Sequence, residues 1–119
     1  MNPSMKKYSL LFLKIIVALP FLGAGIAKIS GVETMVDTFE TIGFGQWFRY
    51  LTGIIEIASA ILLFVPNKQL YGALLLVCTM IGAVGAHLLW LGPSAVPALI
   101  LGALAGIIGF IYRPNKIAS

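Results

Sequence analysis

The sequence predicts an all-α membrane protein, in which four transmembrane helices form a bundle and a short amphipathic helix lies at the membrane interface. Hydrophobic residues make up 60% of the 119 residues and charged residues only 10%, whereas soluble proteins are about 25% charged. The mean hydropathy is +1.02. A soluble core of this size could not bury so much apolar surface, so lipid must solvate it. We expect one domain, residues 1–119.

Four apolar segments are long enough to cross a hydrocarbon core of about 30 Å. They cover residues 8–29, 47–65, 70–91 and 94–112. Pro20 is expected to bend the first segment locally, whereas Pro66 and Pro93 should end the second and third, and Pro97 suits the first turn of the fourth. The N-terminal stretch resembles a signal peptide, but Lys14 interrupts it, so we expect an uncleaved first span.

The connection between the first and second spans, residues 30–46, predicts the amphipathic helix. Its apolar face should hold Val32, Met35, Val36 and Phe39, and its polar face Glu33, Asp37 and Glu40. Ser30 and Glu33 have the spacing of a capping box, which would begin the helix, and Gly43 would end it. Two interpretations are open, a cover over the bundle or a connector on the membrane surface.

The basic residues predict the topology. One side of the membrane would hold Lys6, Lys7, Lys68, Arg113 and Lys116, and the other Glu33, Asp37, Glu40 and Arg49, with Lys28 at the end of the first span. Aromatic residues agree, with Tyr8, Tyr71 and Tyr112 at one interface and Trp47, Tyr50 and Trp90 at the other. By the positive-inside rule, both termini are expected to be cytoplasmic. Topology therefore accounts for the net charge of +4, and we expect no nucleic-acid partner.

Three polar residues stand out within the apolar spans, Lys28, Glu56 and His87. A charged side chain in a span costs about 2.5–3.5 kcal/mol on insertion scales, so such residues usually face a partner. Side chains lean toward the N-terminus of their helix, which would place these three in one layer of the outer half of the bilayer. The sequence predicts an ion pair between Lys28 and Glu56, with His87 hydrogen-bonded nearby.

This polar layer has two interpretations. It could be a structural ion pair that fixes helix register, or it could line a site for a ligand or a proton. One histidine, one cysteine and one glutamate on separate spans do not have the spacing of metal ligands, so no metal site is predicted. Cys78 is the single cysteine, and it can form neither an internal disulfide nor a CxxC pair.

Small residues at four-residue spacing predict close helix contacts. They are Gly23 and Ala27, then Gly82 and Ala86, then Ala98, Gly102 and Gly106. The same positions could instead mediate association with a second copy of the chain.

Several short motifs together resemble the DoxX family of small bacterial membrane proteins. They are the stretch Phe21-Leu22-Gly23-Ala24-Gly25-Ile26-Ala27-Lys28, the pair Ile42-Gly43, the run Leu51-Thr52-Gly53-Ile54-Ile55-Glu56, the exit from Leu63 to Pro66, and His87. The resemblance covers most of residues 8–91. It implies a four-helix bundle in the bacterial cell (inner) membrane. It also implies a role as a small subunit of a quinone-linked or oxidative-stress oxidoreductase complex.

Three functions are compatible with this resemblance. An oxidoreductase subunit would bind quinone or another lipophilic molecule at Lys28, Glu56 and His87, together with partner proteins. A non-enzymatic scaffold or assembly factor, in a complex or a homo-oligomer, would use the same layer as a structural ion pair. A proton-coupled carrier would change the protonation of Glu56. The sequence identifies no catalytic residue and no intrinsic cofactor, so we do not expect catalysis by the chain alone.

Overall fold

The computed structural model describes residues 2–91 and 95–114, with the side chains of Trp90 and Leu91 excepted. Within these residues the chain is helical and has no strand, which confirms the predicted all-α class. The helices are α1 (Pro3–Ser30), α2 (Glu33–Ile42), α3 (Gln46–Leu62), α4 (Gln69–Ala86), the π-helix η1 (His87–Leu91) and α5 (Val96–Ile111). Several predicted features lie outside the described part: Gly92, Pro93, the start of the fourth span at Ser94, Lys116, and the Trp90 side chain.

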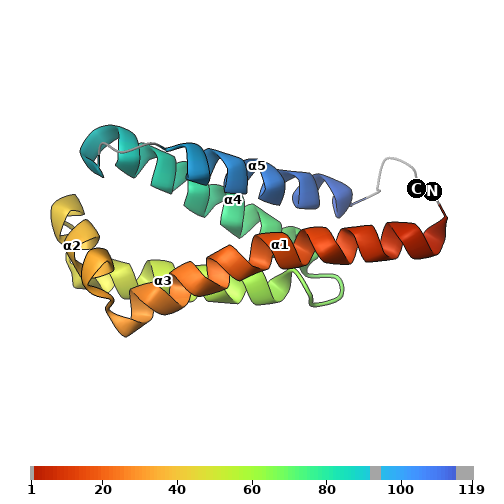
Figure 1. The fold of residues 1–119 in the computed structure, drawn as a ribbon, viewed down its shortest axis with the longest axis horizontal. Coiled ribbons are helices and arrows are strands. Elements are labelled where there is room, and N and C mark those ends of the chain that lie inside the picture. Colours follow the sequence, from red (N-terminus) through yellow and green to blue (C-terminus); the bar gives the residue numbers. More distant parts are fainter. Residues whose placement is uncertain (1, 92–94, 115–119) are drawn as a thin grey trace.

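The helices form two pairs that diverge along the molecule (Figure 1). α1 packs on α3 and α4 on α5, and the contact between α3 and α4 joins the pairs. The molecule measures 48 × 25 × 23 Å. At one end, called here the terminal end, α1 begins and α5 finishes; at the other, the α2 end, the pairs separate and α2 lies beside them.

α1 starts earlier than the predicted span because residues before Tyr8 carry strong helix-start signals. The Asn2 Oδ1 accepts a hydrogen bond from the Met5 backbone N–H at 2.8 Å, and Pro3 occupies the first turn. The helix continues through Pro20 and changes direction along its length, as expected. It ends at Gly31, whose φ of 76° places it in the left-handed region.

The predicted amphipathic helix is confirmed as α2, but its predicted capping box is wrong. Ser30 is the last residue of α1, and its hydroxyl donates to the Ile26 carbonyl at 2.7 Å. α2 follows Val32 and begins without a side-chain cap from the described residues. The end at Gly43 is as predicted, because this glycine adopts a φ of 88°.

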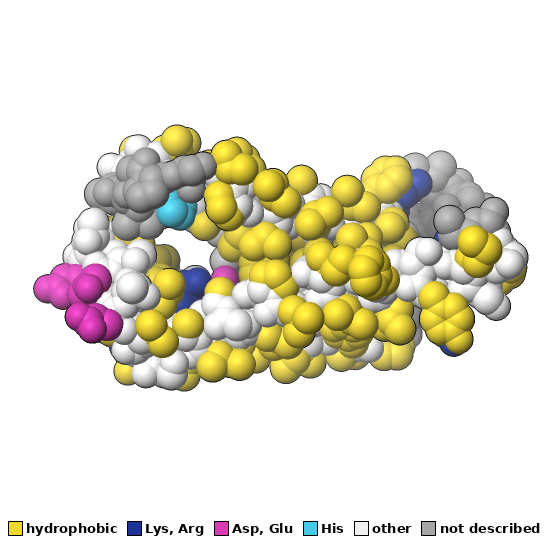
Figure 2. Space-filling view, in the orientation of Figure 1, with side chains coloured by type: hydrophobic (Ala, Val, Ile, Leu, Met, Phe, Trp, Pro, Cys, Tyr) yellow, Lys and Arg dark blue, Asp and Glu magenta, His cyan; other side chains and the backbone are white. Residues whose placement is uncertain are grey.

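α2 is held against the first turn of α3. Phe39 is buried, and its ring meets that of Phe48 edge-on at 5.8 Å between centroids. The Gln46 side chain donates to the Val36 carbonyl at 3.1 Å. The acidic side chains of α2 are exposed and gather at the α2 end of the molecule (Figure 2).

The exterior of the helices is strongly apolar, and hydrophobic side chains cover much of the face shown in Figure 2. In the described part, α1 and the segment Gln69–Leu89 are long and apolar enough to cross a membrane, by length and composition, and α5 is a shorter apolar helix. α3 ends at Leu62, three residues before the predicted end of the second span. In α5, Pro97 lies in the first turn as predicted.

The small residues that bring helices together are only partly those predicted. A Cβ added at Gly23 or Gly82 would meet no described atom within 4 Å, so these two glycines make no close helix contact within the described chain. Their use in association with a second copy stays a prediction. The closest approaches occur instead at Gly25, Gly53 and Gly72. In α5 the prediction is correct, because Ala98 is buried and a Cβ at Gly102 would lie 3.1 Å from the Met80 Cβ.

Candidate functional site

Lys28 and Glu56 form an ion pair, as the sequence predicts. The Lys28 Nζ lies 2.6 Å from the Glu56 Oε1. The Glu56 side chain is 1% exposed and that of Lys28 is 15% exposed. A carboxylate so deeply buried requires a charged partner, and among the described residues Lys28 is the one cation within ion-pairing distance.

A close crossing of two helix backbones brings the pair together. A Cβ at Gly53 of α3 would lie 2.9 Å from the Gly25 carbonyl oxygen of α1, and one at Gly25 would lie 2.8 Å from the Gly53 carbonyl oxygen. Only glycine allows backbones to approach to this distance. Lys28 lies three residues after Gly25, and Glu56 lies three residues after Gly53. Residues three apart lie on the same face of a helix, so Lys28 and Glu56 face each other beside the crossing.

Arg49 belongs to the same cluster, which the sequence analysis missed. We expected this residue among the charges outside the membrane, but it is buried, with 5% exposure. Its Nη1 donates to the Lys28 carbonyl oxygen, one of the last carbonyls of α1, and its Nε donates to the Gln46 Oε1 at 2.8 Å. The guanidinium also lies over the Tyr50 ring at 4.3 Å.

The burial of Arg49 has a local cause. α1 reverses direction at Gly31 and leaves carbonyl groups without intrahelical partners. A cation is favourable at the C-terminal end of a helix, and Arg49 projects from the first turn of α3 to that end. The sequence contained one signal for this role, because a glycine that follows a helix marks the end where carbonyl groups need partners. It did not indicate which cation would supply the hydrogen bond.

His87 occupies a different element, at the start of the π-helix η1. The residue is half-buried, and its Nδ1 is shielded from solvent without a hydrogen-bond partner among the described residues. This nitrogen therefore does not make the hydrogen bond expected near the ion pair. π-Helical turns are rare and frequently mark functional positions, and η1 lies against α2.

A hollow separates the two helix pairs at the α2 end (Figure 2). The histidine side chain is at its rim, and basic and acidic side chains are visible inside it. The cluster in this region has two cations, Lys28 and Arg49, against one buried carboxylate, Glu56. With its excess of hydrogen-bond donors, this arrangement suits a ligand that presents carbonyl or anionic oxygens.

The described residues contain no group of three or more His, Cys, Asp or Glu side chains that could hold a metal ion. Lys28, Arg49 and a single carboxylate are also unsuited to a divalent cation, which prefers several oxygen or nitrogen ligands without competing positive charge.

The model of the DoxX-like family matches residues 12–109 of this chain. The chain belongs to the DoxX-like family. The predicted resemblance is therefore confirmed, and the match extends through most of α5, to which the sequence motifs contributed little.

Two proteins of Bacillus subtilis (strain 168) are similar to this DoxX-like chain. One is named "Uncharacterized protein YdgD" and is 31% identical over 93 residues, which cover 75% of this chain and 82% of that protein. The other is named "Putative oxidoreductase CatD" and is 30% identical over 84 residues, which cover 71% of this chain and 62% of that protein. No solved structure matches the chain.

Proposed function

We propose that this DoxX-like protein is a small integral membrane subunit of a quinone-linked oxidoreductase complex. Its apolar exterior supports an arrangement in which α1, α3, α4 with η1, and α5 each cross a bacterial cell membrane. The distribution of basic residues supports cytoplasmic termini. The name of a relative, "Putative oxidoreductase CatD", supports the link to redox chemistry.

One observation carries the ligand site: the buried Lys28–Glu56 pair lies in the region of the hollow that has the histidine side chain at its rim. The Nδ1 of that histidine, His87, has no hydrogen-bond partner among the described residues. The Lys28 ammonium can donate to a quinone carbonyl, and His87 can donate to the second carbonyl. Glu56 can accept a proton from a reduced quinone hydroxyl. A bound quinone would supply the electron-accepting chemistry, and the protein would orient it and control its protons.

The chain is proposed to work with partner proteins because its sequence has neither a cysteine pair nor a nucleotide-binding motif. Electrons would come from a partner subunit that carries its own cofactor. α2 would cover the site, since it lies against both η1 and the first turn of α3.

A scaffold or assembly function is the alternative, and a specific observation favours it. Arg49 donates to the Lys28 carbonyl, and the Gly25–Gly53 crossing lies one turn from the ion pair. The same cluster therefore fastens α1 to α3 and would be needed without any ligand.

Quinone titration in lipid nanodiscs distinguishes the two functions. We expect wild type to bind a ubiquinone or menaquinone analogue, and His87→Ala and Glu56→Gln to weaken binding about fivefold each, the effect of one lost hydrogen bond. Leu88→Ala is the matched control, because this neighbour in η1 is 75% exposed. Equal affinity in all four folded proteins would refute the site, and no binding to wild type would favour the scaffold.

A further inference from the structure

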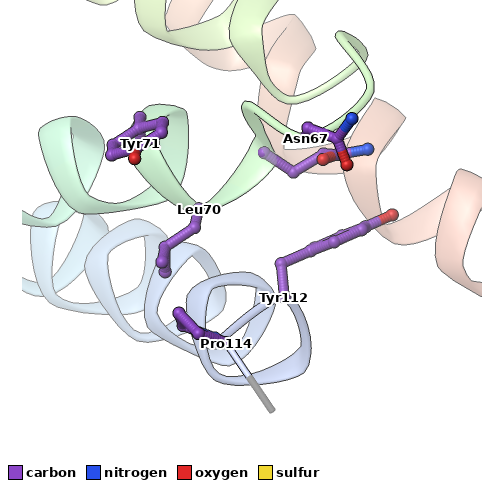
Figure 3. Close-up of a pocket in the computed structure, with 6 residues that line it drawn as sticks. Asn67, Leu70, Tyr71, Tyr112 and Pro114 are labelled. Atoms are coloured by element: carbon purple, nitrogen blue, oxygen red, sulfur yellow. The ribbon is translucent and has the colours of Figure 1, made fainter. Parts of the chain in front are cut away.

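A pocket opens at the terminal end, where α4 begins and α5 ends (Figure 3). Its volume is about 240 Å³. It is lined by Asn67, Gln69, Leu70, Tyr71, Tyr112 and Pro114. Figure 3 shows the side chains of Asn67 and Tyr112 on facing sides of this pocket. Amide and phenol groups can donate hydrogen bonds to a ligand placed between them.

Two lysines lie against aromatic rings at this pocket. The Nζ of Lys14 is 5.4 Å from the centre of the Phe64 ring and 5.3 Å from that of Tyr112. The Nζ of Lys68 is 5.4 Å from the centre of the Tyr71 ring. Since Tyr112 and Tyr71 both line the pocket, each ring holds a positive charge beside it. Lys14 is thus held next to the pocket.

Arg113 adds a third cation, and in the sequence it stands between the pocket residues Tyr112 and Pro114. Its guanidinium lies 3.8 Å from the centre of the Phe110 ring, and its Nη1 donates to the Phe110 carbonyl at 2.7 Å. All acidic side chains of the sequence lie between Glu33 and Glu56, so no aspartate or glutamate of this chain is near this end. The one ion pair in the described part is that of Lys28 at the other end. Among the described residues, the three cations therefore have no carboxylate as a counter-ion.

An apolar groove lies farther along the seam between α4 and α5, in the second half of α4 and the first half of α5. It has a volume of about 240 Å³ and is lined by Val77, Met80, Ile81, Val84, Ala98, Leu99 and Gly102. Leu70 of the polar pocket and Val77, Ile81 and Val84 of the groove fall on one face of α4, because they are separated by seven, four and three residues. At about 1.5 Å per residue, this face extends for about 21 Å.

We propose that this seam binds an anionic phospholipid. The phosphate would occupy the polar pocket as the counter-ion that Lys14, Lys68 and Arg113 lack, with hydrogen bonds from the Asn67 and Gln69 amides. One acyl chain would follow the apolar groove. The pocket is at the end of the helices, where headgroups lie, and Val77, the first groove residue on α4, is about 10 Å farther along the helix than Leu70, which an acyl chain can reach. The combination of a charged pocket with an apolar groove selects a lipid over a free phosphate.

Native mass spectrometry of the full chain in detergent tests this site. We expect dioleoyl phosphatidylglycerol to bind at least tenfold more tightly than dioleoyl phosphatidylcholine, which has the same chains and no net charge. Lys68→Gln should weaken phosphatidylglycerol binding about fivefold, the effect of one basic residue near a lipid surface. The matched control is Lys7→Gln, which removes the same charge from an exposed position of α1 and should change nothing.

Three outcomes would overturn the proposal. The first is equal binding of the two lipids by wild type. The second is an equal loss in Lys7→Gln and Lys68→Gln, which would indicate diffuse attraction to basic residues. The third is binding of sn-glycerol 3-phosphate as tightly as the whole lipid, which would mean that the groove contributes nothing. Each result is independent of quinone binding, because the quinone site is proposed at the α2 end.

Discussion

Removal of the Lys28 charge tests the physical basis of the polar cluster. Lys28→Met keeps most of the aliphatic stem but leaves the Glu56 carboxylate, which is 1% exposed, without its counter-ion at 2.6 Å. Loss of one partner from a buried ion pair typically costs about 3–5 kcal/mol of unfolding free energy. We expect a loss in this range.

The reciprocal change should be milder. Glu56→Gln leaves an amide oxygen that can still accept a hydrogen bond from Lys28, and the Lys28 side chain, which is 15% exposed, can turn its ammonium toward the hollow. We expect a cost of about 1–2 kcal/mol, the charge-assisted part of one hydrogen bond. In the double variant no charge remains uncompensated, so its cost should be about 2 kcal/mol less than the sum of the two single changes.

Equilibrium unfolding in mixed micelles with increasing dodecyl sulfate measures all three variants. Lys7→Met is the matched control, because it removes an exposed lysine from the same helix, and it should change the unfolding free energy by less than about 0.5 kcal/mol. If the single effects add to within about 0.5 kcal/mol, or if Lys28→Met resembles Lys7→Met, the pair does not stabilise the fold as described.

Two further predictions concern packing and topology. Gly53→Ala should lose about 1–2 kcal/mol of unfolding free energy, because its Cβ would lie 2.9 Å from a backbone carbonyl oxygen. Gly23→Ala should gain up to about 1 kcal/mol from helix propensity, because its Cβ would meet no described atom within 4 Å. If Gly23→Ala were the less stable variant in the same unfolding assay, the described crossing would be contradicted. In intact cells, with Cys78 replaced, an impermeant thiol reagent should label a cysteine at Thr34 but not one at Lys7, and the opposite pattern would invert the proposed topology.

The helical, apolar character of this chain could be predicted from the sequence, because it depends on the hydropathy and spacing of residues that are close together in the chain. Hydropathy over windows of about 20 residues and the 3.6-residue period of α2 need no knowledge of neighbouring helices. The Lys28–Glu56 pair was predictable for a related reason. A buried carboxylate must find a cation, and few cations lie within the apolar segments.

The remaining features depend on how the helices rotate against one another. Gly23 and Gly25 are two residues apart, hence about 200° apart around α1, and only packing decides which of them faces α3. The burial of Arg49 likewise follows from the position of the α1 C-terminus. The surroundings of the His87 Nδ1, which has no partner among the described residues, depend on the π-helical turn in which His87 lies. The sequence by itself determined that the chain is helical and apolar and that the Glu56 carboxylate needs a cation. The tertiary structure decided which helix faces meet, because side-chain direction on a helix changes by about 100° per residue.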